Sequence, residues 1–206
     1  MTLKKCRNKQ PLTRKIAKKQ VARLIVIATE GSNTEPDYFN GMFSLNKNPR
    51  VILEVLGTEK GFSAPKHVLQ RLQDVISDED LKFDLDDELW LVIDVDDWPW
   101  NEMNKVVRSA KKSGINVAVS NPCFEVWLIL HIQNFPASGC ETSQKCKQFL
   151  RSIGGSKRNG DLILRNLEPG ISIATQRAIA LDTNASNLVP NKPGTRLYNL
   201  LLSINK

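Results

Sequence analysis

The sequence of 206 residues lacks the features that mark membrane and secreted proteins. Its longest apolar runs, residues 89–93 and 126–130, are far shorter than the roughly 20 residues that a membrane-spanning helix needs. The N-terminal segment is basic for more than twenty residues and has no apolar stretch of the kind found in a secretory signal. We therefore expect a cytoplasmic protein with no membrane contact.

Cysteine and histidine are scarce, and a glycine-rich phosphate loop is missing. The four cysteines, at positions 6, 123, 140 and 146, form no C-x-x-C pair, and the two histidines lie far from them in the sequence. This spacing argues against a zinc ribbon and favours free thiols in a reducing compartment. Without a Walker-type loop, the chain is not expected to hydrolyse ATP itself.

Acidic residues are absent from the first 29 positions, which carry nine of the 29 lysines and arginines. The rest of the chain has 20 basic and 22 acidic residues, so the net charge of +7 belongs to an N-terminal arm. A basic arm favours a polyanion, with nucleic acid as the leading candidate. A solubilising tail is an equal alternative, because the arm has no aromatic residue to stack on bases.

Short β-branched runs alternate with amphipathic patterns along the first two thirds of the chain. Strands are predicted at residues 24–28, 51–56, 89–93 and 115–119, and helices at 36–45, 65–76, 101–112 and 123–132. This alternation predicts an α/β fold with a three-layer, parallel sheet joined by right-handed crossovers. Further helices are predicted at 142–153, 173–181 and 195–204, with loops at 154–160 and 184–194.

The domain organisation follows from these patterns. We expect a basic arm at residues 1–20, an α/β domain at 21–135, and a helical C-terminal extension at 136–206 packed on the same domain. After the fourth strand, Asn121 is interpreted as a helix N-cap and Pro122 as the first helical residue. The following run is apolar nearly all round, which indicates a buried helix.

Acidic side chains follow three of the predicted strands. Glu30 comes after the first strand, Asp94 and Asp96 after the third, and Glu125 lies one helical turn beyond Asn121. The carboxyl ends of parallel strands share one edge of a sheet, where ligands bind. Carboxylates gathered there repel one another unless a hard cation such as Mg²⁺ or Mn²⁺ intervenes. A D-x-D pair alone is more often solvated loop or cap, but together with Glu30 it favours a site.

Other polar residues leave alternatives open. Glu35 precedes a proline-started helix, so a functional role and a helix-stabilising role carry equal weight. Glu125 lies among apolar neighbours and is costly to bury unless it is paired; we favour a site role over a structural one. His131 is interpreted as a buried structural histidine. Trp98 and Trp100 could stack on nucleobases or form a lid, although ordinary loop packing is the simpler interpretation.

Two longer stretches of sequence point to a particular protein family. A glutamate after the first strand and D-x-D after the third resemble the Toprim domain. The string from Leu24 to Phe39, which contains T-E-G and T-E-P-D-Y-F, resembles the N-terminal signature of the RloB family. The string S-N-P-C-F-E-V-W-L-I-L-H, residues 120–131, is similar to that family's most distinctive block. The resemblance covers residues 20–132 well and is weaker from there to the end.

The resemblance implies a Toprim-like fold and a role in anti-phage defence at restriction-linked loci of prokaryotes, beside an ATPase partner of the ABC/AAA kind. By that similarity Glu30 would be the general base or acid, and Asp94 with Asp96 would hold Mg²⁺. Family members often carry a basic residue and a histidine around the D-x-D. Here Val95 separates the aspartates and Asp97-Trp98 follows them, which puts any nearby imidazole role in doubt.

The leading hypothesis is a Mg²⁺-dependent (or Mn²⁺-dependent) nuclease that hydrolyses phosphodiesters of RNA or DNA, with tRNA or phage or host nucleic acid as expected substrates. Glu30, Asp94, Asp96 and Glu125 are the candidate catalytic residues, and Glu30, Asp94 and Asp96 the candidate metal ligands. The alternative is a non-catalytic nucleic-acid-binding or regulatory subunit of the defence complex. A third possibility is nucleotidyl transfer, as in primases.

Overall fold

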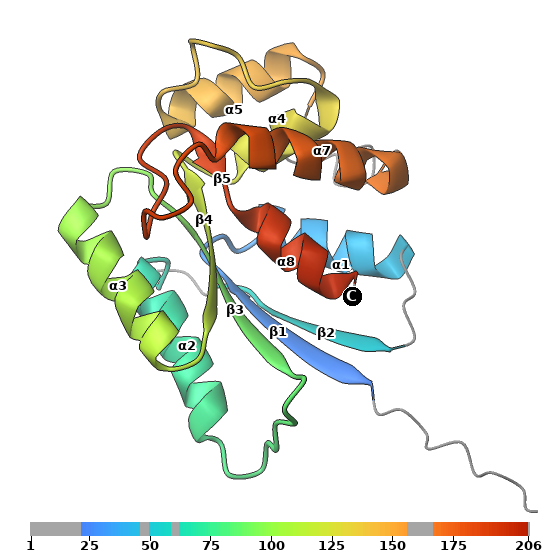
Figure 1. The fold of residues 1–206 in the computed structure, drawn as a ribbon, viewed down its shortest axis with the longest axis vertical. Helices are drawn as coiled ribbons and strands as arrows, with labels where there is room; N and C mark the ends of the chain where they lie inside the picture. Colours follow the sequence, from blue (N-terminus) through green and yellow to red (C-terminus); the bar gives the residue numbers. More distant parts are fainter. Residues whose placement is uncertain (1–21, 46–49, 59–61, 156–166, 206) are drawn as a thin grey trace, which may run out of the picture.

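The computed structural model describes residues 22–45, 50–58, 62–155 and 167–205, so the predicted basic arm lies outside the described residues. The strands form one sheet in the order β2-β1-β3-β4-β5 (Figure 1). Their bounds are β1 (Arg23–Thr29), β2 (Val51–Leu56), β3 (Glu88–Asp94), β4 (Asn116–Asn121) and β5 (Gly194–Thr195). The first four strands are parallel, as the alternating sequence pattern predicted, and β5 joins antiparallel to β4.

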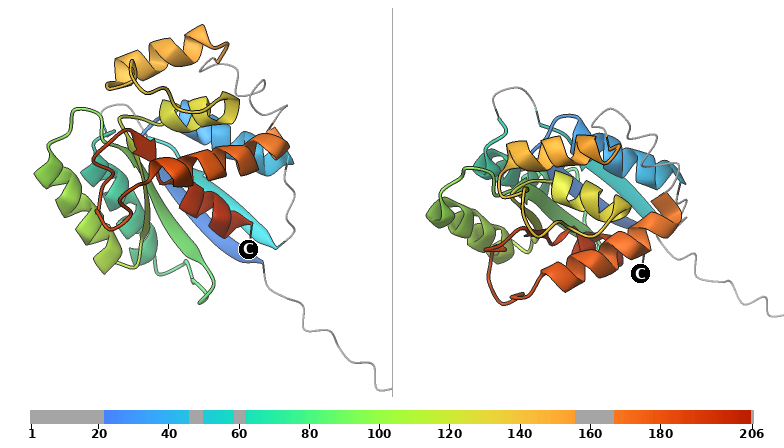
Figure 2. Two further views of the ribbon diagram at one scale, coloured as in Figure 1. Left: turned by 45° about the horizontal axis from the view of Figure 1, so that its top comes forward. Right: turned by 90° about the horizontal axis from the view of Figure 1, so that it is seen from above.

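Helices cover both faces of the sheet and make three layers (Figures 1 and 2). α2 (Pro65–Ser77) packs on one face of the sheet against β1 and β3, and α3 (Trp100–Lys112) packs on the same face against β4; Val26 and Ala28 of β1 belong to this core. Ile25 and Ile27 face the other layer, because successive strand residues point to opposite faces. That layer contains α1 (Thr34–Leu45), α4 (Glu125–Ile132), α7 (Leu167–Leu181) and α8 (Leu197–Ile204). The predicted α/β class is confirmed, and the architecture is consistent with a Toprim-like fold.

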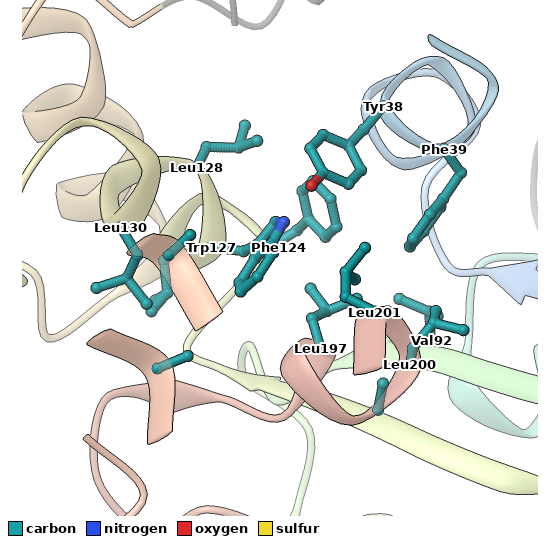
Figure 3. Close-up of a cluster of buried hydrophobic side chains, with 14 of the residues drawn as sticks. Tyr38, Phe39, Val92, Phe124, Trp127, Leu128, Leu130, Leu197, Leu200 and Leu201 are labelled. Atoms are coloured by element: carbon teal, nitrogen blue, oxygen red, sulfur yellow. The ribbon is translucent and has the colours of Figure 1, made fainter. Parts of the chain in front are cut away.

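The larger core lies between the sheet and the layer of α1, α4 and α8 (Figure 3). Trp127 of α4 is fully buried and stands beside Phe124 and Tyr38. Leu197, Leu200 and Leu201 of α8 close the same core from below in the view of Figure 3. The predicted burial of the apolar segment 123–132 is confirmed up to Leu130, whereas His131 is half-buried and Ile132 is exposed.

The prediction that Asn121 caps this helix is wrong. Asn121 is the last residue of β4, and its Nδ2 donates a hydrogen bond to the Pro190 carbonyl at 2.7 Å. The Asn121–Pro122 bond is cis, and α4 begins only at Glu125. Asn121 is thus too far from the first helical residue to accept from its free N–H groups, and it holds the C-terminal segment instead.

The C-terminal segment also differs from its prediction. Residues 194 and 195 were predicted to end a loop and to start a helix, but both belong to β5. Thr195 pairs with Ser120, and their side-chain oxygens form a hydrogen bond of 2.9 Å. α8 therefore begins two residues later, at Leu197. Across the described residues, no helix is long and apolar enough to cross a membrane.

Arg196 connects β5 to the preceding helix α7 and the loop that follows it. Its guanidinium binds both carboxylate oxygens of Asp182, at 2.9 and 3.2 Å, and donates to the carbonyls of Asn184 and Leu188 at 3.0 and 3.2 Å. Arg196 is buried, and the Asp182 side chain beside it is 6% exposed, so water cannot readily replace the guanidinium at this carboxylate.

We expect Arg196→Ala to lower the free energy of unfolding by about 3–5 kcal/mol, because it leaves the Asp182 carboxylate buried without its partner. Chemical denaturation of the variant measures this loss. Arg108→Ala, on the exposed side of α3, is the matched control and is expected to stay within about 0.5 kcal/mol of the natural chain. Equal stability of the two variants would show that Arg196 does not hold the C-terminal segment.

Candidate active site

Three acidic residues lie at the carboxyl edge of the sheet, where the sequence placed them. Asp94 ends β3, and Glu30 directly follows the neighbouring strand β1, with its N–H donating to the Val92 carbonyl at 3.1 Å. Asp96 sits in the turn after β3, with a φ of 40° that few residues other than glycine adopt. Its N–H donates to the Pro122 carbonyl at 2.8 Å, which fixes this turn against the end of β4.

Glu30 is held between β3 and the turn that follows it. Its Oε2 accepts the Asp94 N–H at 3.0 Å, and its Oε1 accepts the Trp98 Nε1–H at 3.2 Å. Burial raises the pKa of Glu30 to about 7; the carboxylates of Asp96 and Glu35 add to this shift, and the two hydrogen bonds oppose it. Glu30 is therefore close to half protonated at neutral pH, which suits proton transfer.

Asp94 is buried and surrounded by like charge. Its Oδ2 accepts the Phe124 N–H at 3.1 Å. Burial raises the pKa of Asp94 well above its usual range, and the carboxylates of Glu35, Glu30 and Asp96 raise it further. Asp96 Oδ1 accepts a hydrogen bond from Ser143. The structure thus brings Glu30, Asp94 and Asp96 together, with Glu35 as a fourth carboxylate.

In both Asp94 and Asp96, one carboxylate oxygen accepts a hydrogen bond from an N–H or O–H group. Within the described part of the chain, no hydrogen bond engages Asp94 Oδ1 or Asp96 Oδ2. Mg²⁺ needs only one or two carboxylates and completes its shell with water, so Asp94 and Asp96 suit such an ion in the number and kind of their ligand atoms. In the same part of the chain, no group of three or more His, Cys, Asp or Glu side chains is arranged as a metal site. A third ligand from Glu30 therefore stays a prediction.

Glu35 reaches the cluster because Gly31 leaves room for it. A Cβ added at Gly31 would lie 1.9 Å from Glu35 Oε2, so the carboxyl group occupies the space of the missing side chain. Glu35 is buried and raises the pKa values of both Glu30 and Asp94. The sequence alone gave equal weight to a functional role and a helix-stabilising role for Glu35. The structure places its carboxyl group beside those of Glu30 and Asp94.

Glu125, the first residue of α4, is buried and lies near a cation. Partial burial lowers the pKa of Lys147, but the carboxylates of Glu125, Asp96 and Asp94 more than offset this, so the pKa is raised. The positive charge of Lys147 thus offsets part of the negative charge of these three carboxylates. The carboxylate of Glu125 thus acts electrostatically on the same cation as the carboxylates of Asp94 and Asp96.

The helix predicted at residues 142–153 is present as α5 (Ser143–Ser152), but its position as the other wall of the site was not predicted. A cleft of about 680 Å³ is lined by Glu30 and Asp96 on one side and by Ser143, Lys147 and Arg151 of α5 on the other. Positions 143, 147 and 151 share one helix face because they are four residues apart. That spacing of polar and basic residues was the available signal, and α5 presents two cations opposite the carboxylates.

Comparison with known families identifies the chain. The family model described as RloB-like protein matches residues 25–204, nearly all of the described fold. The chain belongs to the RloB-like family. No curated protein and no solved structure matched it in these comparisons.

The two strings that resemble the RloB family both contribute carboxylates to the site, although only Glu30 among them lines the cleft. Residues 24–39 supply Glu30 and Glu35, and residues 120–131 supply Glu125. His131 lies elsewhere in this RloB-like fold: its Nε2 is 3.1 Å from the Tyr38 hydroxyl, in the core between α1 and α4. Burial lowers the pKa of His131 to about 4, so it is neutral near pH 7.

The cysteines of this RloB-like chain show no disulfide among the described residues. Cys123, Cys140 and Cys146 are buried free thiols, and Cys146 Sγ donates to the Cys140 carbonyl at 3.2 Å. Cys6 lies outside the described residues. The prediction of free thiols is confirmed for the three described cysteines.

Proposed function

We propose that this RloB-like chain is a Mg²⁺-dependent nuclease that hydrolyses phosphodiesters of RNA or DNA. The observation that carries the proposal is the cleft at the carboxyl edge of the sheet. Acidic groups from two separate strands line one side of it, and Lys147 and Arg151 line the other. Such a cleft suits a phosphate group, which needs cations on its oxygens and a proton acceptor near the attacking water.

Asp94 and Asp96 are the residues that would hold the ion. Bound Mg²⁺ orients a phosphate oxygen and makes a water molecule more acidic. The remaining chemistry falls to the chain itself. The Glu30 carboxylate accepts a proton from the attacking water as the new P–O bond forms, and the P–O bond to the leaving sugar oxygen breaks. That oxygen then takes a proton from solvent or from protonated Glu30.

Glu30 can fill this role although both of its oxygens already accept hydrogen bonds. Each carboxylate oxygen has two lone pairs, and the Asp94 N–H and Trp98 Nε1–H occupy one on each oxygen. These two bonds fix the direction of the remaining lone pairs. The pKa of about 7 allows Glu30 both to accept and to release a proton at neutral pH.

Lys147 and Arg151 are proposed to bind the phosphate oxygens. We expect Lys147→Ala to lower kcat/KM by about 10- to 100-fold, since it removes a charge-assisted hydrogen bond to the phosphate. Lys145→Ala is the matched control on the same helix: Lys145 is exposed and pairs with Glu141 at 2.8 Å, away from the cleft. Steady-state kinetics measure both variants, and equal rates in the two would remove Lys147 from the site.

The test of the proposed activity is an assay of the full chain on mixed RNA and DNA with Mg²⁺ or Mn²⁺. We expect cleavage that requires the ion, either from the chain alone or together with its proposed ATPase partner. The proposed setting is prokaryotic anti-phage defence, with tRNA or phage or host nucleic acid as substrate. The assay therefore includes tRNA and phage DNA as separate substrates.

A second candidate is a non-catalytic nucleic-acid-binding or regulatory subunit. It is favoured by one observation, that the described residues hold no ready group of three metal-ligating side chains. Tight binding of nucleic acid that is independent of metal, with no turnover even beside the ATPase, would favour this candidate. Metal-dependent cleavage would exclude it.

A further inference from the structure

A second cavity lies beside the candidate active site, between α2 and α3. Its volume is about 480 Å³, within the range of small-molecule pockets in proteins. We call it the α2–α3 pocket. Trp98 lines both this pocket and the cleft of the candidate site, and its Nε1–H donates to Glu30 Oε1. The indole is therefore a shared wall, held in place by the acidic cluster.

The walls of the pocket combine apolar and cationic groups. Pro65, Met103 and Val106 supply apolar surface beside the Trp98 indole, and Lys66 and Lys105 are exposed at the pocket. An indole with apolar surroundings suits a nucleobase, because every base has a face that stacks on aromatic rings. Lysines suit the phosphate group that each nucleotide carries. The α2–α3 pocket thus has groups that suit both the base and the phosphate of a nucleotide.

The backbone adds to this preference. α2 and α3 both begin at the pocket, and neither Ala64 nor Pro99, their N-cap residues, makes a side-chain cap hydrogen bond. Neither N-cap residue thus satisfies the first N–H groups of its helix, although Asn101 Oδ1 accepts the Glu102 N–H of α3 at 2.9 Å; the N–H groups left over favour anions. His67 also lines the pocket, and within the described residues its buried Nδ1 has no hydrogen-bond partner.

One acidic residue, Glu102, lines the pocket as well. It is exposed in the first turn of α3 and is outnumbered by the two lysines. A carboxylate repels phosphate but accepts hydrogen bonds from the exocyclic amino groups of bases. Its presence beside an apolar wall therefore suits the base end of a nucleotide, and the lysines suit the phosphate end.

We propose that the α2–α3 pocket binds one nucleotide of a nucleic-acid strand, with the base against Trp98 and the phosphate at Lys66 and Lys105. The inference rests on the proposed function in one respect: the bound nucleotide is the one that flanks the hydrolysed phosphodiester. Ser63 lines the cleft and the adjacent Ala64 lines the pocket, so a strand can pass directly from one to the other over Trp98.

The test is quenching of tryptophan fluorescence in the full chain by the four ribonucleoside 5′-monophosphates, with EDTA present. Stacking on Trp98 is expected to quench its emission, and Trp98→Phe should lose most of this quenching. The double variant Lys66→Ala, Lys105→Ala should weaken nucleotide binding about tenfold or more. The matched control, Lys111→Ala with Lys112→Ala, changes two exposed lysines at the far end of α3 and should bind as the natural chain does.

The inference is overturned by no quenching at all, by quenching that both lysine pairs leave unchanged, or by equally strong competition from ribose 5-phosphate, which has no base. Loss of ATPase association in the Lys66/Lys105 variant without any nucleotide binding would assign the pocket to a protein contact and would also overturn it. Asp94→Asn is expected to bind nucleotides normally. Nucleotide binding in a chain that shows no nuclease activity, either alone or with the ATPase partner, would therefore refute the proposed function and leave nucleotide binding in the pocket standing.

Discussion

Asp94→Asn is expected to lower the rate of metal-dependent hydrolysis by at least about 100-fold, the scale seen when one polar group is removed from a preorganised catalytic site. Asparagine keeps the size of the side chain and an oxygen that can accept the Phe124 N–H. It replaces the other oxygen, which no hydrogen bond engages among the described residues, by an amide NH₂ group that cannot bind a cation.

The same substitution is not expected to unfold the protein. Asp94 is buried and its pKa is raised by burial and by Glu35, Glu30 and Asp96, so the ionised form is unfavourable in the folded state without metal. A neutral asparagine removes this repulsion. Lost activity together with an unchanged or higher Tm is therefore the expected signature.

Asp86→Asn is the control for Asp94→Asn, because Asp86 precedes β3 at the end opposite Asp94, its side chain is exposed, and it does not line the cleft. Hydrolysis by this variant should stay within about threefold of that by the natural chain, as expected of a surface substitution. Equal losses in the two variants, or full activity of Asp94→Asn, would contradict the assignment of the ion to Asp94.

The stability of the metal-free protein is expected to fall as the pH rises from about 5 to 8. Glu30 has a folded pKa of about 7 against an ordinary value of 4.5, so the folded state binds more protons than the unfolded state between these values. The stabilising contribution is complete below pH 4.5 and is lost as the pH rises through 7. It amounts to about 3 kcal/mol at most, and Asp94 acts in the same direction.

Mg²⁺ is expected to reverse this trend, because a cation stabilises the ionised carboxylates that the metal-free fold disfavours. The rise in Tm on adding Mg²⁺ should be larger at pH 8 than at pH 5.5. Thermal unfolding at both pH values, with EDTA and with Mg²⁺, measures the effect.

Glu30→Gln isolates the contribution of Glu30 to this pH dependence. The amide leaves one of two donors, the Asp94 N–H or the Trp98 Nε1–H, without an acceptor, which costs about 1–3 kcal/mol at every pH. The cost is independent of pH, so the variant should show a flatter slope between pH 5 and 8. An identical slope in the variant and the natural chain would show that Glu30 does not titrate in this range.

Much of the fold followed from local pattern. The parallel strands and the helices between them were predictable because buried runs and amphipathic stretches alternate, and because connections of this kind are right-handed. The residue at which α4 begins and the strand β5 could not be predicted in this way. Gly194 and Thr195 carry no strand signal of their own, and they become a strand only because Ser120 and Asn121 at the end of β4 offer them pairing partners.

The residues of the candidate site likewise include some that the sequence could predict and some that it could not. Glu30, Asp94 and Asp96 could be placed together from sequence because strand ends share an edge of the sheet. Lys147 could not, because α5 lies far along the chain and reaches the cleft only through tertiary packing. The pKa of Glu30 was equally hidden, since it depends on burial and on the approach of Trp98.

The most direct test of the central claim is the anomalous scattering of Mn²⁺ in crystals of the full chain. The account predicts an ion at the carboxyl edge of the sheet, bound by one oxygen each of Asp94 and Asp96 at about 2.1–2.2 Å, with Glu30 close enough to reach its water shell. The Asp94→Asn variant should lose this peak. Absence of an ion from this edge at millimolar Mn²⁺, or an undiminished peak in the variant, would contradict the account.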